Sequence, residues 1–156
     1  VAGVRAAYVD TIMALRRRAV ATADVSARVR LTKSPADYTA ARDDRRELAY
    51  EALIAAGRTT WTAGEHVRVY RARAGRAGLV DDAADPRDYD IDHYVRVLRD
   101  TFASRLARAF APADFSALLD DPEQQSLFAP AYGSMRTILT TISTAGTDPV
   151  ESPSSA

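Results

Sequence analysis

The sequence predicts a mainly helical α+β fold, and three observations lead to this prediction. Apolar residues recur at helical spacing in several separate stretches. Between these stretches lies a short region where valines alternate with charged residues, which is typical of a half-buried strand. The chain has 156 residues and no cysteine, so one modest core without disulfides is expected.

The first part of the chain shows two helix signals and one extended segment. Residues 4–18 form the first predicted helix, and its apolar stripe consists of Val4, Tyr8, Ile12 and Leu15. Residues 28–32 alternate between apolar and polar, which predicts a short extended segment with a basic face. Ser34 before Pro35 is typical of a helix N-cap, so a helical turn should open there.

The next predicted elements are a helix and a hairpin. The helix begins at Asp43 or Asp44 and ends at Gly57, a residue typical of helix C-termini. Alternation over residues 66–71, after a turn at 63–64, predicts a β-hairpin that Trp61 closes against the core. Residues 79–80 are expected to return as a further strand.

The second part of the chain should contain the longest helix. Asp90 is expected to cap a helix of about 20 residues, whose apolar face consists of Ile91, Tyr94, Val95, Leu98, Phe102, Leu106 and Phe110. Pro112 and Pro122 each predict a short helix. Residues 1–128 are therefore expected to form one domain, and residues 129–156 a flexible tail, because its end is rich in Ser, Thr, Pro and Gly.

Charge is distributed unevenly although the net charge is zero. Up to Val80 there are 15 basic and 8 acidic residues, giving +7, and the remainder carries 6 and 13, giving −7. This asymmetry predicts that the first part meets a polyanion. The alternative is a compositional bias toward arginine, which accounts for 20 of the 21 basic residues.

Common enzyme signatures are missing from the sequence. It contains no phosphate-binding loop, no GxGxxG, no HExxH and no GxSxG. The group Asp88, Asp90, Asp92 and His93 resembles a metal site by composition, but helix capping explains these carboxylates better. The lack of cysteine and the charged start of the chain predict a cytoplasmic protein without a membrane partner.

Four segments, taken in order, resemble the thumb region of family B DNA polymerases. In that family a Leu-x-Lys pattern and then Tyr precede a helix, a Gly-Asp/Glu-x-Val-x-Tyr hairpin follows, and Tyr-Asp-x-x-x-Tyr opens a long helix. The matching segments here are Leu31-Thr32-Lys33 with Tyr38, the Ala-rich helix before Gly57, Trp61 to Tyr70 (WTAGEHVRVY), and Tyr89 to Tyr94 (YDIDHY). One departure is Asp43-Asp44 where the family usually has Pro-His. The resemblance covers about residues 4–128.

The resemblance implies a polymerase part without the catalytic residues. Polymerase chemistry uses two Mg²⁺ held by carboxylates of the palm, in an Asp-x-x-Ser-Leu-Tyr motif and an Asp-Thr-Asp turn. Neither motif occurs here, nor does the Lys-x-x-x-Asn-Ser-x-Tyr-Gly run of a fingers helix. We therefore expect no catalytic residue, metal site or cofactor in this chain, with Mg²⁺ belonging to the palm of the full polymerase.

A thumb grips primer-template duplex DNA through its phosphates, which requires cations and no base readout. The resemblance aligns Lys33 and Tyr38 with the family pattern, and Tyr38 is expected to donate a hydrogen bond to a phosphate. The other candidates are basic residues that would otherwise form an ordinary solvated surface: Arg28, Arg30, Arg42, Arg45, Arg46 and Arg58.

A second motif lies near the end of this region. Gln124-Gln125-Ser126-Leu127-Phe128 resembles the short peptide by which bacterial polymerases bind the sliding clamp. Gln124 would fix the register while Leu127 and Phe128 fill an apolar pocket, although the same two residues could simply pack a short helix. The expected function is thus DNA gripping in replication or repair, close to the nucleoid. The alternative is a stand-alone, non-catalytic DNA-binding or protein-interaction domain.

Overall fold

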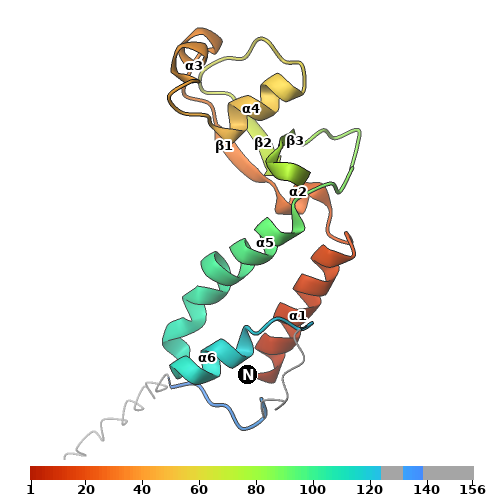
Figure 1. The fold of residues 1–156 in the computed structure, drawn as a ribbon, viewed down its shortest axis with the longest axis vertical. Helices are drawn as coiled ribbons and strands as arrows, with labels where there is room; N and C mark the ends of the chain where they lie inside the picture. Colours follow the sequence, from red (N-terminus) through yellow and green to blue (C-terminus); the bar gives the residue numbers. More distant parts are fainter. Residues whose placement is uncertain (124–131, 139–156) are drawn as a thin grey trace, which may run out of the picture.

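The computed structural model describes residues 1–123 and 132–138 and has a mainly helical α+β architecture with a small antiparallel sheet. Figure 1 shows an elongated molecule, with the sheet, α3 and α4 at one end and α1, α5 and α6 at the other. In chain order the elements are α1 (Ala2–Arg16), α2 (Thr22–Val25), β1 (Ala27–Arg30), α3 (Pro35–Ala41), α4 (Leu48–Ala55), β2 (His66–Arg71), η1 (Arg73–Gly75), β3 (Ala77–Leu79), α5 (Ile91–Val97), η2 (Leu98–Phe102), η3 (Ala103–Ala109) and α6 (Pro112–Leu118).

The sheet has the strand order β1-β2-β3, and both pairings are antiparallel. Val67 and Val69 of β2 are buried on the face that packs against α4. Leu53 of α4, Leu31 and Tyr38 complete this core. Because side chains alternate along a strand, the opposite face of β1 and β2 carries charged residues, except at Tyr70, which is buried in a second core cluster with Leu15 and Tyr89.

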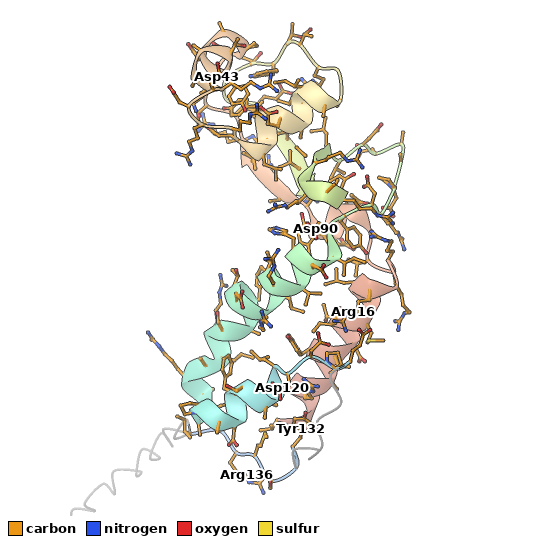
Figure 2. All side chains as sticks on the ribbon, in the orientation of Figure 1. Arg16, Asp43, Asp90, Asp120, Tyr132 and Arg136 are labelled. Carbon is orange, nitrogen blue, oxygen red and sulfur yellow. The ribbon has the colours of Figure 1, made fainter. Side chains whose placement is uncertain are left out.

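The helical end is held by apolar contacts and by ion pairs between distant segments. Tyr8 and Ile12 of α1 pack with Leu119, and Val95 and Leu98 lie against this cluster. Arg5 donates to the backbone carbonyls of residues 118 and 120, and its guanidinium lies 5.3 Å from the ring centre of Tyr132. Figure 2 labels Asp120 and Tyr132 at this end of the molecule.

Two predicted helix caps are confirmed. The Ser34 hydroxyl accepts from the Asp37 backbone N–H at 3.2 Å, and the Asp37 carboxylate accepts from Ser34 in return, so the two form a capping box. Asp90 accepts from the His93 backbone N–H at 3.0 Å. The strand over residues 66–71 is also confirmed, and the returning strand lies two residues earlier than predicted, at 77–79.

The helix predicted from Asp43 or Asp44 begins later, at Leu48. Residues 45–47 have no helical conformation, and the Glu47 backbone N–H donates to the Tyr38 hydroxyl at 3.2 Å. The segment around Trp61 does not pair with β2; the strand that precedes β2 in the chain and pairs with it is β1, and the 35 residues between the two strands include α3 and α4. Trp61 instead packs on Tyr50 and donates to the Lys33 carbonyl at 3.0 Å, which is the core-closing role expected for it.

The long predicted helix is irregular. Only Ile91–Val97 is α-helical, and a π-helical turn and then a 3-10 segment continue it to Ala109. Both irregular segments change the rotation per residue, so the stripe expected for a regular helix does not stay on one face. Phe102 and Leu106 are therefore 55% and 40% exposed and are not part of the core.

The sequence predicts that residues 132–138 belong to the tail. In the structure the Ile138 N–H donates to the Ala109 carbonyl at 2.9 Å, so this segment contacts the end of η3. Gln124, Leu127 and Phe128 of the clamp-like motif lie outside the described residues, as does most of the short helix predicted after Pro122. Within residues 1–123 and 132–138, no helix combines the length and apolarity needed to cross a bilayer.

Candidate nucleic-acid interface

The solvent-facing side of the sheet carries four cationic or titratable side chains on two strands. We call this surface the basic sheet face; it consists of Arg28, Arg30, His66 and Arg68, and all four residues are exposed. The register places Arg28 opposite Arg68 and Arg30 opposite His66. The alternation that buries Val67 and Val69 therefore brings these four side chains together on the other side.

The hydrogen-bond pattern brings the opposing side chains close to each other. The Leu31 N–H donates to the Glu65 carbonyl at 2.8 Å. Because antiparallel partners exchange hydrogen bonds only at alternate positions, Val29–Val67 is also a bonded pair and Arg28–Arg68 is a non-bonded pair. Non-bonded pairs have the shorter separation between side chains, and like charges placed directly opposite are destabilising. The fold thus tolerates two guanidinium groups in neighbouring positions.

No acidic group neutralises this surface within the described ranges. Arg28 and Arg30 make no hydrogen bond or ion pair with any described residue. Arg68 donates to the Ala23 carbonyl at 3.3 Å and to the Ser26 hydroxyl at 3.5 Å, and both of these partners are neutral. The three arginines of the basic sheet face are therefore not paired with an acidic group in the described part of the chain.

Three other predicted cations are already paired with glutamates. Lys33 donates to Glu47 and also forms an ion pair with it. Arg42 binds Glu51 through two nitrogens, at 2.8 and 2.9 Å, and Arg58 donates to Glu65 at 2.9 Å. A phosphate would have to compete with these carboxylates for the three cations.

The pKa of Glu51 reflects this pairing. The hydrogen bonds from Arg42 and then from Tyr38 lower the pKa of Glu51 to about 2. The Arg58 guanidinium likewise lowers the pKa of the Glu65 carboxyl. Both glutamates are thus charged at neutral pH, and each forms an ion pair with its arginine.

The hydrogen bond expected from Tyr38 to a phosphate does not fit the structure, because this side chain is not accessible to a ligand. Tyr38 is fully buried and stacks on Tyr50, with 4.4 Å between ring centres. Its hydroxyl donates to Glu51 at 2.7 Å and accepts from the Glu47 backbone, and burial raises the pKa of Tyr38. Leu31 and Tyr38 of the Leu-x-Lys…Tyr pattern therefore pack in the core beneath α4.

Arg45 and Arg46 are exposed on the connection between α3 and α4, and neither forms an ion pair with a described residue. They remain available to a phosphate together with Arg28 and Arg30. Of the eight predicted DNA-binding residues, these four are exposed and unpaired in the described part of the chain.

Folding pairs three basic residues of the first 80 positions with acidic residues from the rest of the chain. Arg16 of the basic part binds Asp121 of the acidic part at 2.9 Å. Arg71 lies 3.9 Å from Asp90, and Arg76 lies at the same distance from Asp88. Part of the basic charge of the first 80 residues is therefore paired, while the basic sheet face and the α3–α4 connection carry four predicted DNA-binding residues without an ion pair to a described residue.

Comparison with protein-family models, with curated proteins and with solved structures found no match for this chain. The assignment of this surface as a candidate interface therefore rests on the geometry and charge described above. In the part of the chain that the structure describes, no three His, Cys, Asp or Glu side chains lie together as a metal site would require.

Two members of the basic sheet face were not among the predicted residues, namely His66 and Arg68. A signal for them was present in the sequence, since Val67 and Val69 alternate with them and had to face the core. The missing information was the pairing with β1, which joins residues far apart along the chain.

Proposed function

We propose that this chain is the thumb-like C-terminal part of a family B DNA polymerase, which grips primer-template duplex DNA through its phosphates and carries no catalytic palm of its own. The observation that carries the proposal is the unneutralised pair of Arg28 and Arg68 at directly opposed positions of the sheet. A polyanion backbone offsets the repulsion between such groups, and arginine binds phosphate through two parallel hydrogen bonds.

The proposed grip involves no recognition of individual bases, and the chemistry of the basic sheet face agrees with this. Guanidinium groups on a sheet recognise the regular spacing of phosphates and do not distinguish bases unless they enter a groove. A duplex gripped in this way can slide through the protein, as a polymerase requires. The clamp-like motif at Gln124, Leu127 and Phe128 supplies a second part of the proposal, a tether to the bacterial sliding clamp.

The salt dependence of duplex binding tests the proposed grip on DNA phosphates. We expect the anisotropy of a fluorescein-labelled duplex of about 20 base pairs to give a plot of log affinity against log salt with a slope of about −3 to −5. Replacing Arg28 and Arg68 together by Ala should weaken binding and reduce the magnitude of the slope by about 0.9 for each lost contact.

Two control variants make the result specific. Arg108→Ala removes an exposed arginine from the helical end and should leave the slope unchanged. Tyr38→Phe removes a hydroxyl that the structure keeps buried, so duplex affinity should also stay as it was. Equal losses in the Arg108 and Arg28/Arg68 variants would remove the basic sheet face from the proposal. No duplex binding at low salt would favour the protein-interaction alternative.

A further inference from the structure

The outer edge of β3 carries unpaired backbone groups. The Ala72 N–H donates to the Arg76 carbonyl at 2.8 Å, and the Val80 N–H donates to the Arg68 carbonyl at 2.9 Å. Gly78 is therefore the residue of β3 that exchanges hydrogen bonds with β2, opposite Tyr70, while the N–H and C=O groups of residues 77 and 79 point away from the sheet. No described residue pairs with these outward groups.

The two edges of the sheet differ in how they are protected. At the β1 edge, Arg28 and Arg30 place charged side chains beside the open backbone, which discourages the addition of another strand. The β3 edge consists of Ala77, Gly78 and Leu79, without a charge. An open edge of this kind is a template for an additional strand.

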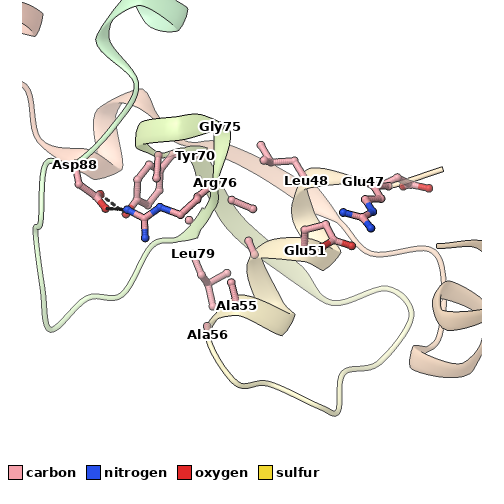
Figure 3. Close-up of a pocket in the computed structure, with 15 residues that line it drawn as sticks. Glu47, Leu48, Glu51, Ala55, Ala56, Tyr70, Gly75, Arg76, Leu79 and Asp88 are labelled. Carbon is pink, nitrogen blue, oxygen red and sulfur yellow. Dashed lines mark hydrogen bonds and ion pairs between the residues drawn. The ribbon is translucent and has the colours of Figure 1, made fainter. Parts of the chain in front are cut away.

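A groove runs along this unprotected edge. It has a volume of about 710 Å³ and lies between β3 and α4, which Figure 3 shows with Leu79 close to Ala55 and Ala56. Seven of its fifteen lining residues are Ala or Gly, which leaves room for the side chains of an incoming segment. Leu48, at one end, is 42% exposed and offers an apolar contact.

The charge that remains free at the rim of the groove is positive. The two glutamates at the rim, Glu47 and Glu51, are paired with Lys33 and Arg42, which lie outside the groove lining. Asp88 accepts a hydrogen bond from the buried Tyr70 hydroxyl at 2.7 Å, and Arg76 lies 3.9 Å from it (Figure 3). Arg46 forms no ion pair within the described ranges, although its charge contributes to the lowered pKa of Glu51. An acidic side chain complements this rim better than a basic one.

We propose that the β3 edge and its groove bind an extended, acidic peptide segment of a partner protein, which adds to the sheet as a fourth strand. The outward backbone groups of Ala77 and Leu79 supply main-chain hydrogen bonds, and the groove takes alternate small apolar side chains. Arg46 and Arg76 attract flanking carboxylates, Arg76 in competition with Asp88, which lies 3.9 Å from it. The site lies on a different edge of the sheet from Arg28 and Arg30, and Arg46 is the one residue that it shares with the proposed DNA-binding residues.

The probe is a fluorescein-labelled peptide that contains Glu-Val-Thr-Val-Glu between Gly-Ser ends. We expect saturable binding by anisotropy, and a loss of at least tenfold when alternate peptide nitrogens are methylated, because methylation removes the donors that face β3. A peptide with Lys in place of both Glu should bind more weakly. Equal affinity for the methylated and unmethylated peptides would overturn the strand-addition model.

Substitutions in the protein provide the matching test. Ala77→Pro removes one outward N–H and leaves the bonds to β2 in place. The preceding Arg76 already has the extended conformation that proline requires, with φ −65° and ψ 149°. Peptide affinity should fall about five- to tenfold while the circular dichroism spectrum and duplex affinity stay unchanged. Retained peptide affinity in a folded variant would contradict the proposal.

A charge variant keeps the test valid if the proline variant does not fold. Arg76→Glu should lower the affinity for the acidic peptide. Arg73→Glu, in the same exposed turn but outside the groove, should leave this affinity unchanged. Equal effects of the two would refute the charge pairing. Sedimentation without peptide tests for a second copy as the occupant: a concentration-dependent dimer that Ala77→Pro abolishes would replace the peptide proposal with pairing between two β3 edges.

Discussion

Replacing Gly78 by Ala should destabilise the fold markedly, although the change adds a single methyl group. A Cβ at this position would lie 2.4, 2.5 and 2.8 Å from three atoms of the Tyr70 ring. The ring cannot simply move aside, because Tyr70 is buried and its hydroxyl donates to Asp88 at 2.7 Å. The sheet therefore has to give way, or the ring has to leave its site.

The expected cost has two parts. Overpacking of a well-packed site costs about 1–3 kcal/mol, and loss of the hydrogen bond to Asp88 adds about 1 kcal/mol. A total of about 2–4 kcal/mol corresponds to a fall in Tm of roughly 4–16 °C for a chain of this length. Urea unfolding followed by circular dichroism, together with a thermal scan, measures both quantities.

Gly3→Ala is the matched control. A Cβ at Gly3 meets no atom within 4 Å, and the residue lies in α1, where Ala is favoured over Gly by up to about 1 kcal/mol. The same substitution should thus stabilise at one site and destabilise at the other. A Gly78→Ala variant within about 0.5 kcal/mol of the parent chain would show that the described packing of Tyr70 against β3 is wrong.

Two further predictions concern other parts of the chain. Glu51→Gln should lower the free energy of unfolding by about 1–2 kcal/mol near neutral pH, since it breaks the charged pair with Arg42. The pKa of Glu51 falls from 4.5 to about 2 on folding, so its contribution is complete above pH 4.5 and disappears as the pH falls through 2; urea titrations of both proteins should converge over that interval, and a constant difference would contradict the pairing. Leu127→Ala with Phe128→Ala should abolish pull-down of a bacterial sliding clamp, and retention of the clamp by this double variant would remove the clamp from the proposed function.

Local signals in the sequence predicted much of the fold correctly. Ser34 with Pro35 and Asp90 mark helix starts because their side chains bond to nearby backbone groups, and such contacts need no knowledge of the rest of the chain. The alternation around Val67 and Val69 likewise identified β2. These features are fixed within a few residues.

Features that depend on distant contacts were not predictable in the same way. The late start of α4 follows from the Tyr38 hydroxyl, which holds the Glu47 backbone outside the helix. The exposure of Phe102 follows from a π-helical turn that the apolar spacing does not reveal.

The candidate site shows the same limit. Arg28 and Arg30 were identified from their strand pattern, but the proximity of Arg68 depends on a pairing between strands far apart in sequence. Conversely, Lys33, Arg42 and Arg58 were counted as free cations because their glutamate partners become neighbours only in the folded chain.

The bond between Arg16 and Asp121 has a consequence for how this molecule can be divided. It joins the first helix to a residue 105 positions later, and Arg5 reaches the carbonyls of residues 118 and 120 in the same way. A cut after the β3 strand separates Arg16, Arg71 and Arg76 from Asp121, Asp90 and Asp88. Two such fragments, mixed after separate synthesis, would recover these bonds only by reassembling with each other, which makes the loop at 81–88 a natural place to split the chain into a complementing pair.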